Sequence, residues 1–163
     1  MKRSHLAKIS VLAVVLLAIS VQAQDDGNKR LSVTVSFGAG LNTPPASPTN
    51  HHVLPKTIEI KAGGVVNFVV AGFHQILVYL PGKSPEDIVV PSSGLFIDDL
   101  VNLYYQGIVP AGGPTSLPVT TDPSNARNRT ESVFFSEPGT YLVICNVRPH
   151  FLNGMFAFVK VSQ

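Results

Sequence analysis

The 163-residue sequence contains a single cysteine, Cys145, and few charged side chains. One cysteine excludes a disulfide bond within the chain and any centre that needs two thiolates. Charged residues make up 13% of the sequence, and they form neither a basic stripe that would bind nucleic acid nor a polybasic patch for a membrane surface. The length allows one domain with a sizeable core, but not two large ones.

The longest apolar run, residues 9–19, is too short to cross a membrane comfortably, because a spanning helix needs about 20 apolar residues. Lys2, Arg3 and Lys8 come before it, and small residues around Ala23 follow it. This order is typical of a secretory signal peptide. We therefore predict a signal peptide at residues 1–23 and one exported domain at 24–163, periplasmic or secreted, with no stable membrane insertion after cleavage. An uncleaved anchor is the weaker alternative.

Short segments with apolar or alternating residues predict β-strands, whereas no internal repeat or long amphipathic helix is present. The predicted strands are residues 31–37, 57–61, 65–70, 76–80, 132–135, 140–145 and 155–161. Gly63 and Gly64 predict a tight turn between the second and third. Residues 42–50 predict a loop, and residues 82–131 a long irregular connection with a short helix at 97–106. The sequence thus predicts an all-β fold, an antiparallel Greek-key β-sandwich or barrel of about seven to eight strands.

A thiol, an imidazole and a thioether occur at five-residue steps, in Cys145, His150 and Met155. With 5 His and 2 Met in 163 residues, chance gives one cysteine this spacing on the order of once in a few thousand cases. A type 1 (blue) copper site combines a thiolate, two imidazoles and a weakly bound thioether. The second imidazole is expected from His74, because the strand that follows it should lie beside the strand ending at Cys145.

Each of these residues alone has a structural explanation, since buried Cys and Met fill cores and most histidines are simply hydrogen-bonded. The joint spacing favours the metal. His51 and His52 lie in a Pro-rich loop, where they would bind a second ion or face solvent. We favour a plain loop, because adjacent residues of an extended chain point apart.

Counting donors limits the chemistry further. A trinuclear copper cluster needs about eight histidines, and four remain after residue 23. A binuclear copper centre needs two cysteines. The chain is therefore predicted not to be an enzyme.

Two segments resemble the cupredoxin family. Residues 136–141 (SEPGTY), which lead to Cys145, and the alternating residues after Met155 are similar to its last two strands. Residues 58–68 (IEIKAGGVVNF) are similar to the strand pair before its first histidine ligand. The four-residue gaps on either side of His150 most resemble the ligand loop of the rusticyanin and auracyanin type.

The resemblance implies one copper ion held by His74, Cys145, His150 and Met155, and a monomeric one-electron carrier. It also implies that a redox partner docks transiently near His150. The alternative function is copper storage, delivery or sensing without electron transfer.

The sequence departs from the family at Gln75, where Asn is common, so the hydrogen bond between the two ligand loops is expected to differ. The connection at 82–131 is also longer than in the smallest members. Within it, Asp98, Asp99, Tyr104 and Tyr105 would form either a partner surface or a local packing cluster, and we favour packing.

Overall fold

The computed structural model describes residues 30–38, 51–110 and 127–163. The predicted signal peptide and the predicted loop at 42–50 lie outside these ranges. In the described part of the chain, no helix has the length and apolar character needed to cross a membrane.

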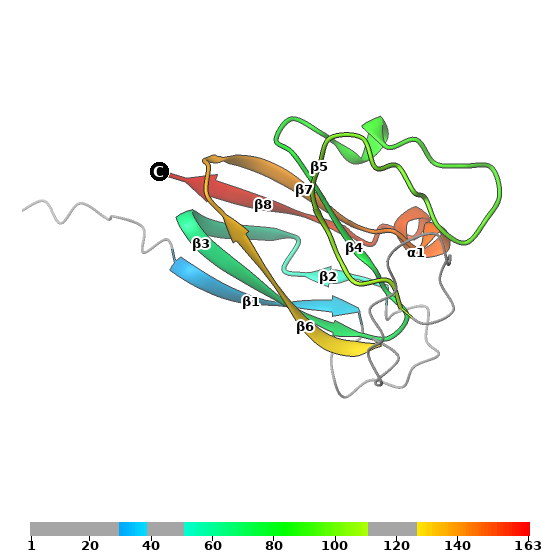
Figure 1. Cartoon of the computed structure of the whole chain (residues 1–163), viewed down its shortest axis with the longest axis horizontal. Helices are drawn as coiled ribbons and strands as arrows, with labels where there is room; N and C mark the ends of the chain where they lie inside the picture. The colour runs from blue at the N-terminus through cyan, green and yellow to red at the C-terminus, as the bar shows by residue number, and fades with distance from the viewer. Residues whose placement is uncertain (1–29, 39–50, 111–126) are drawn as a thin grey trace, which may run out of the picture.

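Eight strands and two very short helices make up the described fold (Figure 1). In chain order they are β1 (Arg30–Gly38), β2 (Val53–Leu54), β3 (Thr57–Ala71), β4 (Ile76–Tyr79), the 3-10 helix η2 (Pro85–Asp87), β5 (Leu103–Gln106), β6 (Asn128–Phe135), β7 (Gly139–Cys145), α1 (Arg148–Leu152) and β8 (Phe156–Ser162). The strands join in the order β2-β1-β3-β8-β7-β4-β5, and β6 pairs with β3. The all-β prediction is confirmed.

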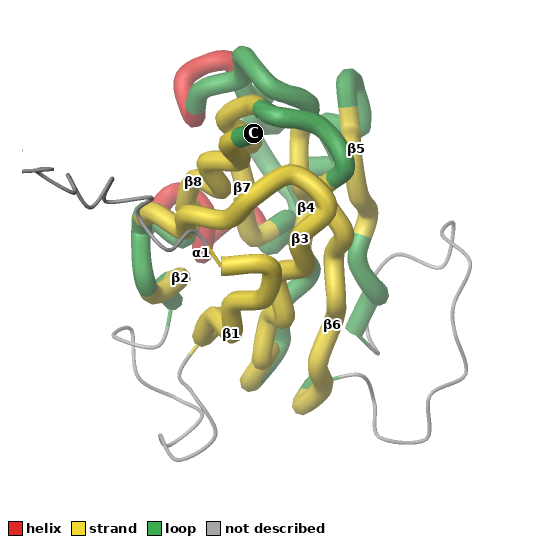
Figure 2. Tube along the Cα trace, turned by 90° about the vertical axis from the view of Figure 1, so that its left-hand side faces the viewer, coloured by secondary structure: helices red, strands yellow, loops and turns green. Residues whose placement is uncertain are grey.

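The 15-residue strand β3 connects the two layers of the fold. Its first half pairs in parallel with β8, from Thr57 opposite Phe158 onward. Its second half pairs in parallel with β1 and antiparallel with β6. Gly63, with a φ of 81°, stands where β3 changes partners. Strands β1, β2 and β6 therefore lie on one side, and β4, β5, β7 and β8 on the other (Figure 2).

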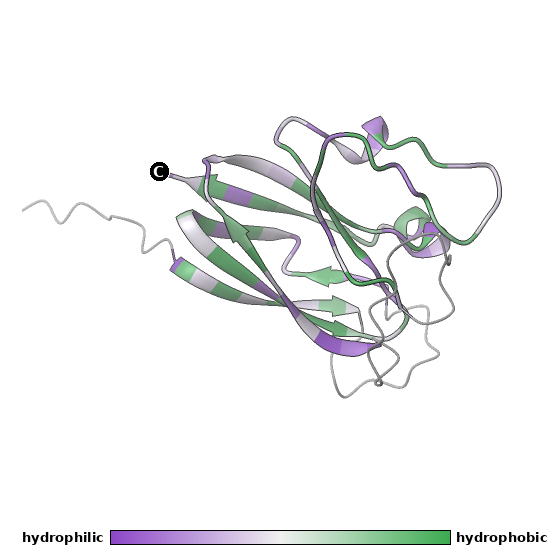
Figure 3. Ribbon diagram, in the orientation of Figure 1, coloured by the Kyte–Doolittle hydropathy of each residue, from purple (hydrophilic) through white to green (hydrophobic). Residues whose placement is uncertain are grey.

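The core lies between these two layers. Alternate residues of β1, β3 and β6 point inward, including Val35, Phe68 and Phe135, and meet Val143 and Val159 of the other layer. The alternation follows from the period-two geometry of a strand, which sends successive side chains to opposite faces. The apolar positions are visible along the strands in Figure 3.

Strands β4 and β7 are buried on both faces, because the connection after β4 covers their outer side. Ile88 and Ile97 of this connection pack against Leu77, Leu142 and Ile144. The described part of the long connection is thus a cover over the sheet. This double burial explains why β4 and the end of β7 are apolar without interruption.

Three details of the strand prediction are wrong. Residues 57–71 form one strand, because the Gly63–Gly64 step bends the chain between partners instead of reversing it. The sheet is mixed, since the β1–β3 and β3–β8 pairs are parallel. The predicted helix at 97–106 is absent from these described residues, whose last four form β5 against β4.

Candidate metal centre

The centre begins where β4 and β7 lie side by side. Ile76, the first residue of β4, pairs with Cys145, the last residue of β7, so the segment that leads into β4 reaches Cys145 at the same end of the sandwich. This places the ring of His74 next to the Cys145 thiol, as the sequence predicts. The His74 Nδ1 lies 3.6 Å from the Cys145 Sγ.

The segment after Cys145 turns back over it. The single turn α1 begins at Arg148 and has Pro149 as its second residue, a position that suits Pro because the N–H groups of the first turn have no partner within the helix. The Met155 N–H donates to the His150 carbonyl at 3.0 Å, and the Cys145 N–H donates to the Met155 carbonyl at 3.0 Å. These two backbone bonds close the loop and hold Cys145, His150 and Met155 near one another.

Three donor atoms converge there. The His150 Nδ1 lies 3.7 Å from the Cys145 Sγ and 3.0 Å from the His74 Nδ1. Metal–nitrogen and metal–sulfur bonds are about 2.0–2.3 Å long, so donors that share one ion lie roughly 3–4 Å apart. The three atoms fit this requirement. Met155 is fully buried beside Cys145 in the same apolar cluster, a place suited to a weak thioether donor.

Burial keeps the donor side chains neutral in the metal-free protein. It lowers the pKa of His74 to about 3 and that of His150 to about 4, with further lowering from neighbouring histidines. It raises the pKa of Cys145 to about 12, although backbone hydrogen bonds from Val147 and Gln75 act in the opposite direction. The neutral imidazoles are ready to ligate, whereas the thiol must lose its proton when a metal binds.

The His74 ring is also held on the side that faces away from Cys145 and His150. It hydrogen-bonds to the Ala71 backbone, and because its Nδ1 faces Cys145 and His150, the group available for this bond is Nε2–H. Such a bond sets the tautomer that leaves Nδ1 free as a ligand. A side chain at Gly38 would come within 2.7 Å of the His74 Nε2, so Gly38 gives the ring its space.

Gln75 and Asn146 join the two ligand loops. The Asn146 side-chain amide donates to the Gln75 Oε1 at 2.8 Å, and the Asn146 N–H donates to the Gln75 carbonyl at 2.8 Å. The Gln75 amide donates to the Gly107 carbonyl at 3.0 Å. The hydrogen bonding between the two ligand loops, which the sequence predicts to differ because of Gln75, is therefore present. It extends through Gln75 to Gly107, just after β5.

The structure adds His51 to the site. Its ring stacks on that of His150, with centroids 3.7 Å apart and planes 17° apart. One ring nitrogen from each of His51, His74 and His150 lies within 4.8 Å of the others. Among the described residues, the His51 Nδ1 is a buried side-chain nitrogen with no hydrogen-bond partner. The sequence signal was weak, because His51 has no regular spacing to the other donors.

Tyr104 and Tyr105 make internal contacts, and so does Asp99. Tyr104 stacks on Phe135, the Tyr105 hydroxyl donates to Glu131, and Asp99 accepts from the backbone of Val89. These contacts agree with the packing-cluster interpretation of this part of the connection.

The chain is similar to several solved structures. Auracyanin from the photosynthetic bacterium Roseiflexus castenholzii aligns at 16% identity and a TM-score of 0.49, over 83% of this chain and 99% of that one. Pseudoazurin from Methylobacterium extorquens aligns at 19% identity and a TM-score of 0.42, over 81% and 76%. The copper protein rusticyanin aligns at 22% identity and a TM-score of 0.45, over 80% and 76%. These are cupredoxins, the family that the sequence resembles.

No family model and no curated protein matches the chain.

Proposed function

We propose that this chain is a mononuclear type 1 copper protein that carries single electrons between redox partners. The observation that supports it is the convergence of the His74 Nδ1, the His150 Nδ1 and the Cys145 Sγ within 3.0–3.7 Å of one another. Met155 is buried in the same apolar cluster as Cys145 and bonds to its backbone. One thiolate, two imidazoles and a weak thioether form the donor set of blue copper sites. When bound, copper supplies a Cu(I)/Cu(II) couple.

The protein's contribution is to keep the donors in place in both oxidation states. His74 and Cys145 are held by the pairing of β4 with β7, and His150 by the bonds that close the loop to Met155. Donors fixed in this way need little rearrangement when the charge changes, which favours fast electron transfer. The apolar residues around the Cys145 sulfur and the weak Met155 donor would tune the potential.

Copper storage, delivery or sensing is the alternative. Delivery favours exposed donors that can exchange with a partner. Here Cys145 is 0% and His74 2% exposed, and hydrogen bonds fix both loops. This burial favours the carrier over the delivery protein.

Export and docking complete the proposal. We assign the protein to the periplasm or the extracellular space, on the predicted signal peptide. His150 is partly exposed, and its neighbour Leu152 in α1 is 57% exposed. A small apolar surface of this kind suits a transient redox partner.

The test is addition of Cu(II) to metal-free protein, followed by its visible spectrum and a cycle of reduction and reoxidation. The expected result is an intense thiolate-to-copper absorption band that disappears and returns reversibly. Cys145→Ser should abolish the band and weaken copper binding by more than about 100-fold, since even outer-shell changes cost 10- to 100-fold.

His52→Asn is the matched control, because His52 neighbours the site but lies outside the described histidine group. It should keep the band. Colourless binding of Cu(I) alone by the wild-type protein would contradict electron transfer and support the storage alternative.

A further inference from the structure

Strand β6 carries an ion pair into the interior. Arg129 and Glu131 lie two residues apart on the inward face that continues with Val133 and Phe135. Their side chains are 6% and 2% exposed, and Arg129 Nη2 pairs with Glu131 Oε1. Burying two charges removes them from water, and apolar residues in their place are often at least as stabilising. The pair therefore needs an explanation beyond stability.

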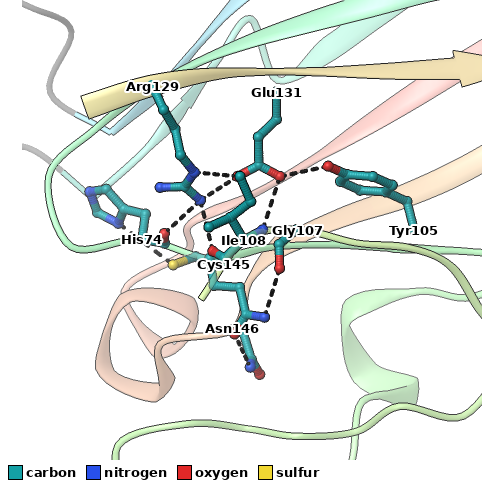
Figure 4. Close-up of polar contacts among 9 residues, drawn as sticks. His74, Tyr105, Gly107, Ile108, Arg129, Glu131, Cys145 and Asn146 are labelled. Carbon is teal, nitrogen blue, oxygen red and sulfur yellow. Dashed lines mark hydrogen bonds and ion pairs between the residues drawn. The ribbon is translucent and has the colours of Figure 1, made fainter. Parts of the chain in front are cut away.

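Both oxygens of the Glu131 carboxylate accept hydrogen bonds. Its Oε1 accepts from the Arg129 Nε at 2.6 Å, and its Oε2 accepts from the Tyr105 hydroxyl at 2.8 Å and the Ile108 N–H at 3.2 Å. These bonds connect β6 to β5 and the segment after it (Figure 4). The negative charge is thus held by donors from three residues, Arg129, Tyr105 and Ile108.

The guanidinium of Arg129 reaches toward the proposed centre. Its Nη2 donates to the His74 carbonyl at 3.1 Å and to the Ile108 carbonyl at 3.0 Å. In the register of β6 with β3, Arg129 lies opposite Val70 and Glu131 opposite Phe68. A strand rises about 3.3 Å per residue. The backbone of Arg129 therefore lies two residues closer than that of Glu131 to the end of β3 that leads to His74.

The ion pair has one orientation relative to the centre. The Arg129 guanidinium lies between the labelled His74 and the Glu131 carboxylate in Figure 4 and donates to the His74 carbonyl, whereas the carboxylate accepts from Tyr105 and Ile108. The ion pair is therefore a fixed dipole with its positive end toward the centre.

We propose that Arg129, oriented by Glu131 and Tyr105, is a positioning residue that holds the ligand His74 through its carbonyl and raises the reduction potential of the site. This inference rests on the proposed function. A nearby cation disfavours the oxidised state, which carries one more positive charge, and so favours reduction. Glu131 moderates the effect, because it compensates part of the charge of Arg129.

The test compares reduction potentials of copper-loaded variants. Glu131→Gln removes the anion and keeps the shape, so the potential should rise. The double variant Arg129→Gln with Glu131→Gln removes the dipole, so the potential should fall. Arg129→Lys keeps the charge but cannot make the same set of bonds. The reduction potential of Arg129→Lys should stay close to that of the wild type. In the metal-free variant, the NMR spectrum should show more than one signal for the His74 ring.

Lys83→Gln is the control for loss of an ion-pair cation elsewhere, since Lys83 pairs with Asp99 at 3.7 Å. Its potential should equal that of the wild type. If Glu131→Gln and the double variant only lower the unfolding temperature and leave the reduction potential unchanged, the ion pair only stabilises the fold and the inference is overturned. If the double variant does not fold, Glu131→Gln still decides the sign. A wild-type protein that binds no copper would overturn the proposed function, and the inference with it.

Discussion

At the scale of single residues, the position of His51 decides how many imidazoles a metal can use. The lone pair of an imidazole nitrogen lies in the plane of its ring. The His51 and His150 rings are 3.7 Å apart and nearly parallel, so an ion in the plane of His150 lies well outside the plane of His51. In this arrangement His51 packs against the proposed ligand His150 and is not expected to be a ligand of the same ion.

His51→Phe should therefore keep the visible band and nearly wild-type copper affinity, because phenyl can replace the stacked ring. His51→Ala should weaken binding by roughly 2- to 12-fold, the range that corresponds to about 0.5–1.5 kcal/mol for an aromatic pair. Competition titration with a Cu(I) chelator measures both. A loss with Phe as large as that of Cys145→Ser would instead make His51 a direct donor.

The sequence could predict the site residues that lie close together along the chain, but not those that only the fold brings together. Cys145, His150 and Met155 were predictable because a short loop closes on itself, so sequence spacing becomes spatial proximity. His51 meets His150 only through the pairing of β2 with β1, a contact between distant segments. Arg129 and Glu131 did leave a signal, since they occupy the inward period of β6 where apolar residues are expected.

At the scale of secondary-structure elements, the end of β1 limits the position of His74. Gly38 is the last residue of β1, has a φ of 100°, and lies against the His74 ring. A Cβ at this position would meet the Ala71 carbonyl oxygen and would come within 2.7 Å of the His74 Nε2 and 2.8 Å of its Cδ2. The proposed centre lies at the ends of β4 and β7, but it also depends on the end of β1, where Gly38 leaves room for the His74 ring.

Gly38→Ala should lower copper affinity and shift the visible band, because the imidazole must move from its place. Gly82→Ala is a close control: its φ is 99°, but nothing lies within 4 Å of the added Cβ. Both variants should lose about 1–3 kcal/mol of unfolding free energy from the strained backbone. Gly38→Ala should lose more than this, because its Cβ also meets the Ala71 carbonyl and the His74 ring. Equal copper affinity in the two variants would show that Gly38 serves only the turn.

The element predictions failed where tertiary contacts outweigh local pattern. The paired glycines at 63 and 64 predict a turn in isolation, yet β3 continues because β8 occupies one half of it and β1 and β6 the other. Helix α1 has five residues, too few for a helical period to appear. By contrast, the pairing of β4 with β7 was predictable, because both are short apolar runs, one beginning shortly after His74 and the other ending at Cys145.

At the scale of the whole molecule, the metal-free donors make folding depend on pH. His74 and His150 have pKa values of about 3 and about 4 in the folded protein, against 6.5 for the ordinary side chain. Unfolded chains therefore take up more protons as the pH falls below 6.5. The stability that these neutral imidazoles provide is complete above that pH and is lost as the pH falls toward 4.

Urea unfolding of the metal-free protein should show this loss between pH 6.5 and pH 4, with a slope of up to about 1.4 kcal/mol per pH unit for each fully shifted group. His150→Gln should reduce the slope, because it removes one of the two groups. Copper at 100 times its dissociation constant should add about 2.7 kcal/mol at neutral pH. This increment should shrink in acid, since protons compete for the imidazoles and the thiolate. A metal-free protein equally stable at pH 6.5 and pH 4 would show that the two rings gain solvent or a partner on protonation, and that the donor set is less rigid than electron transfer requires.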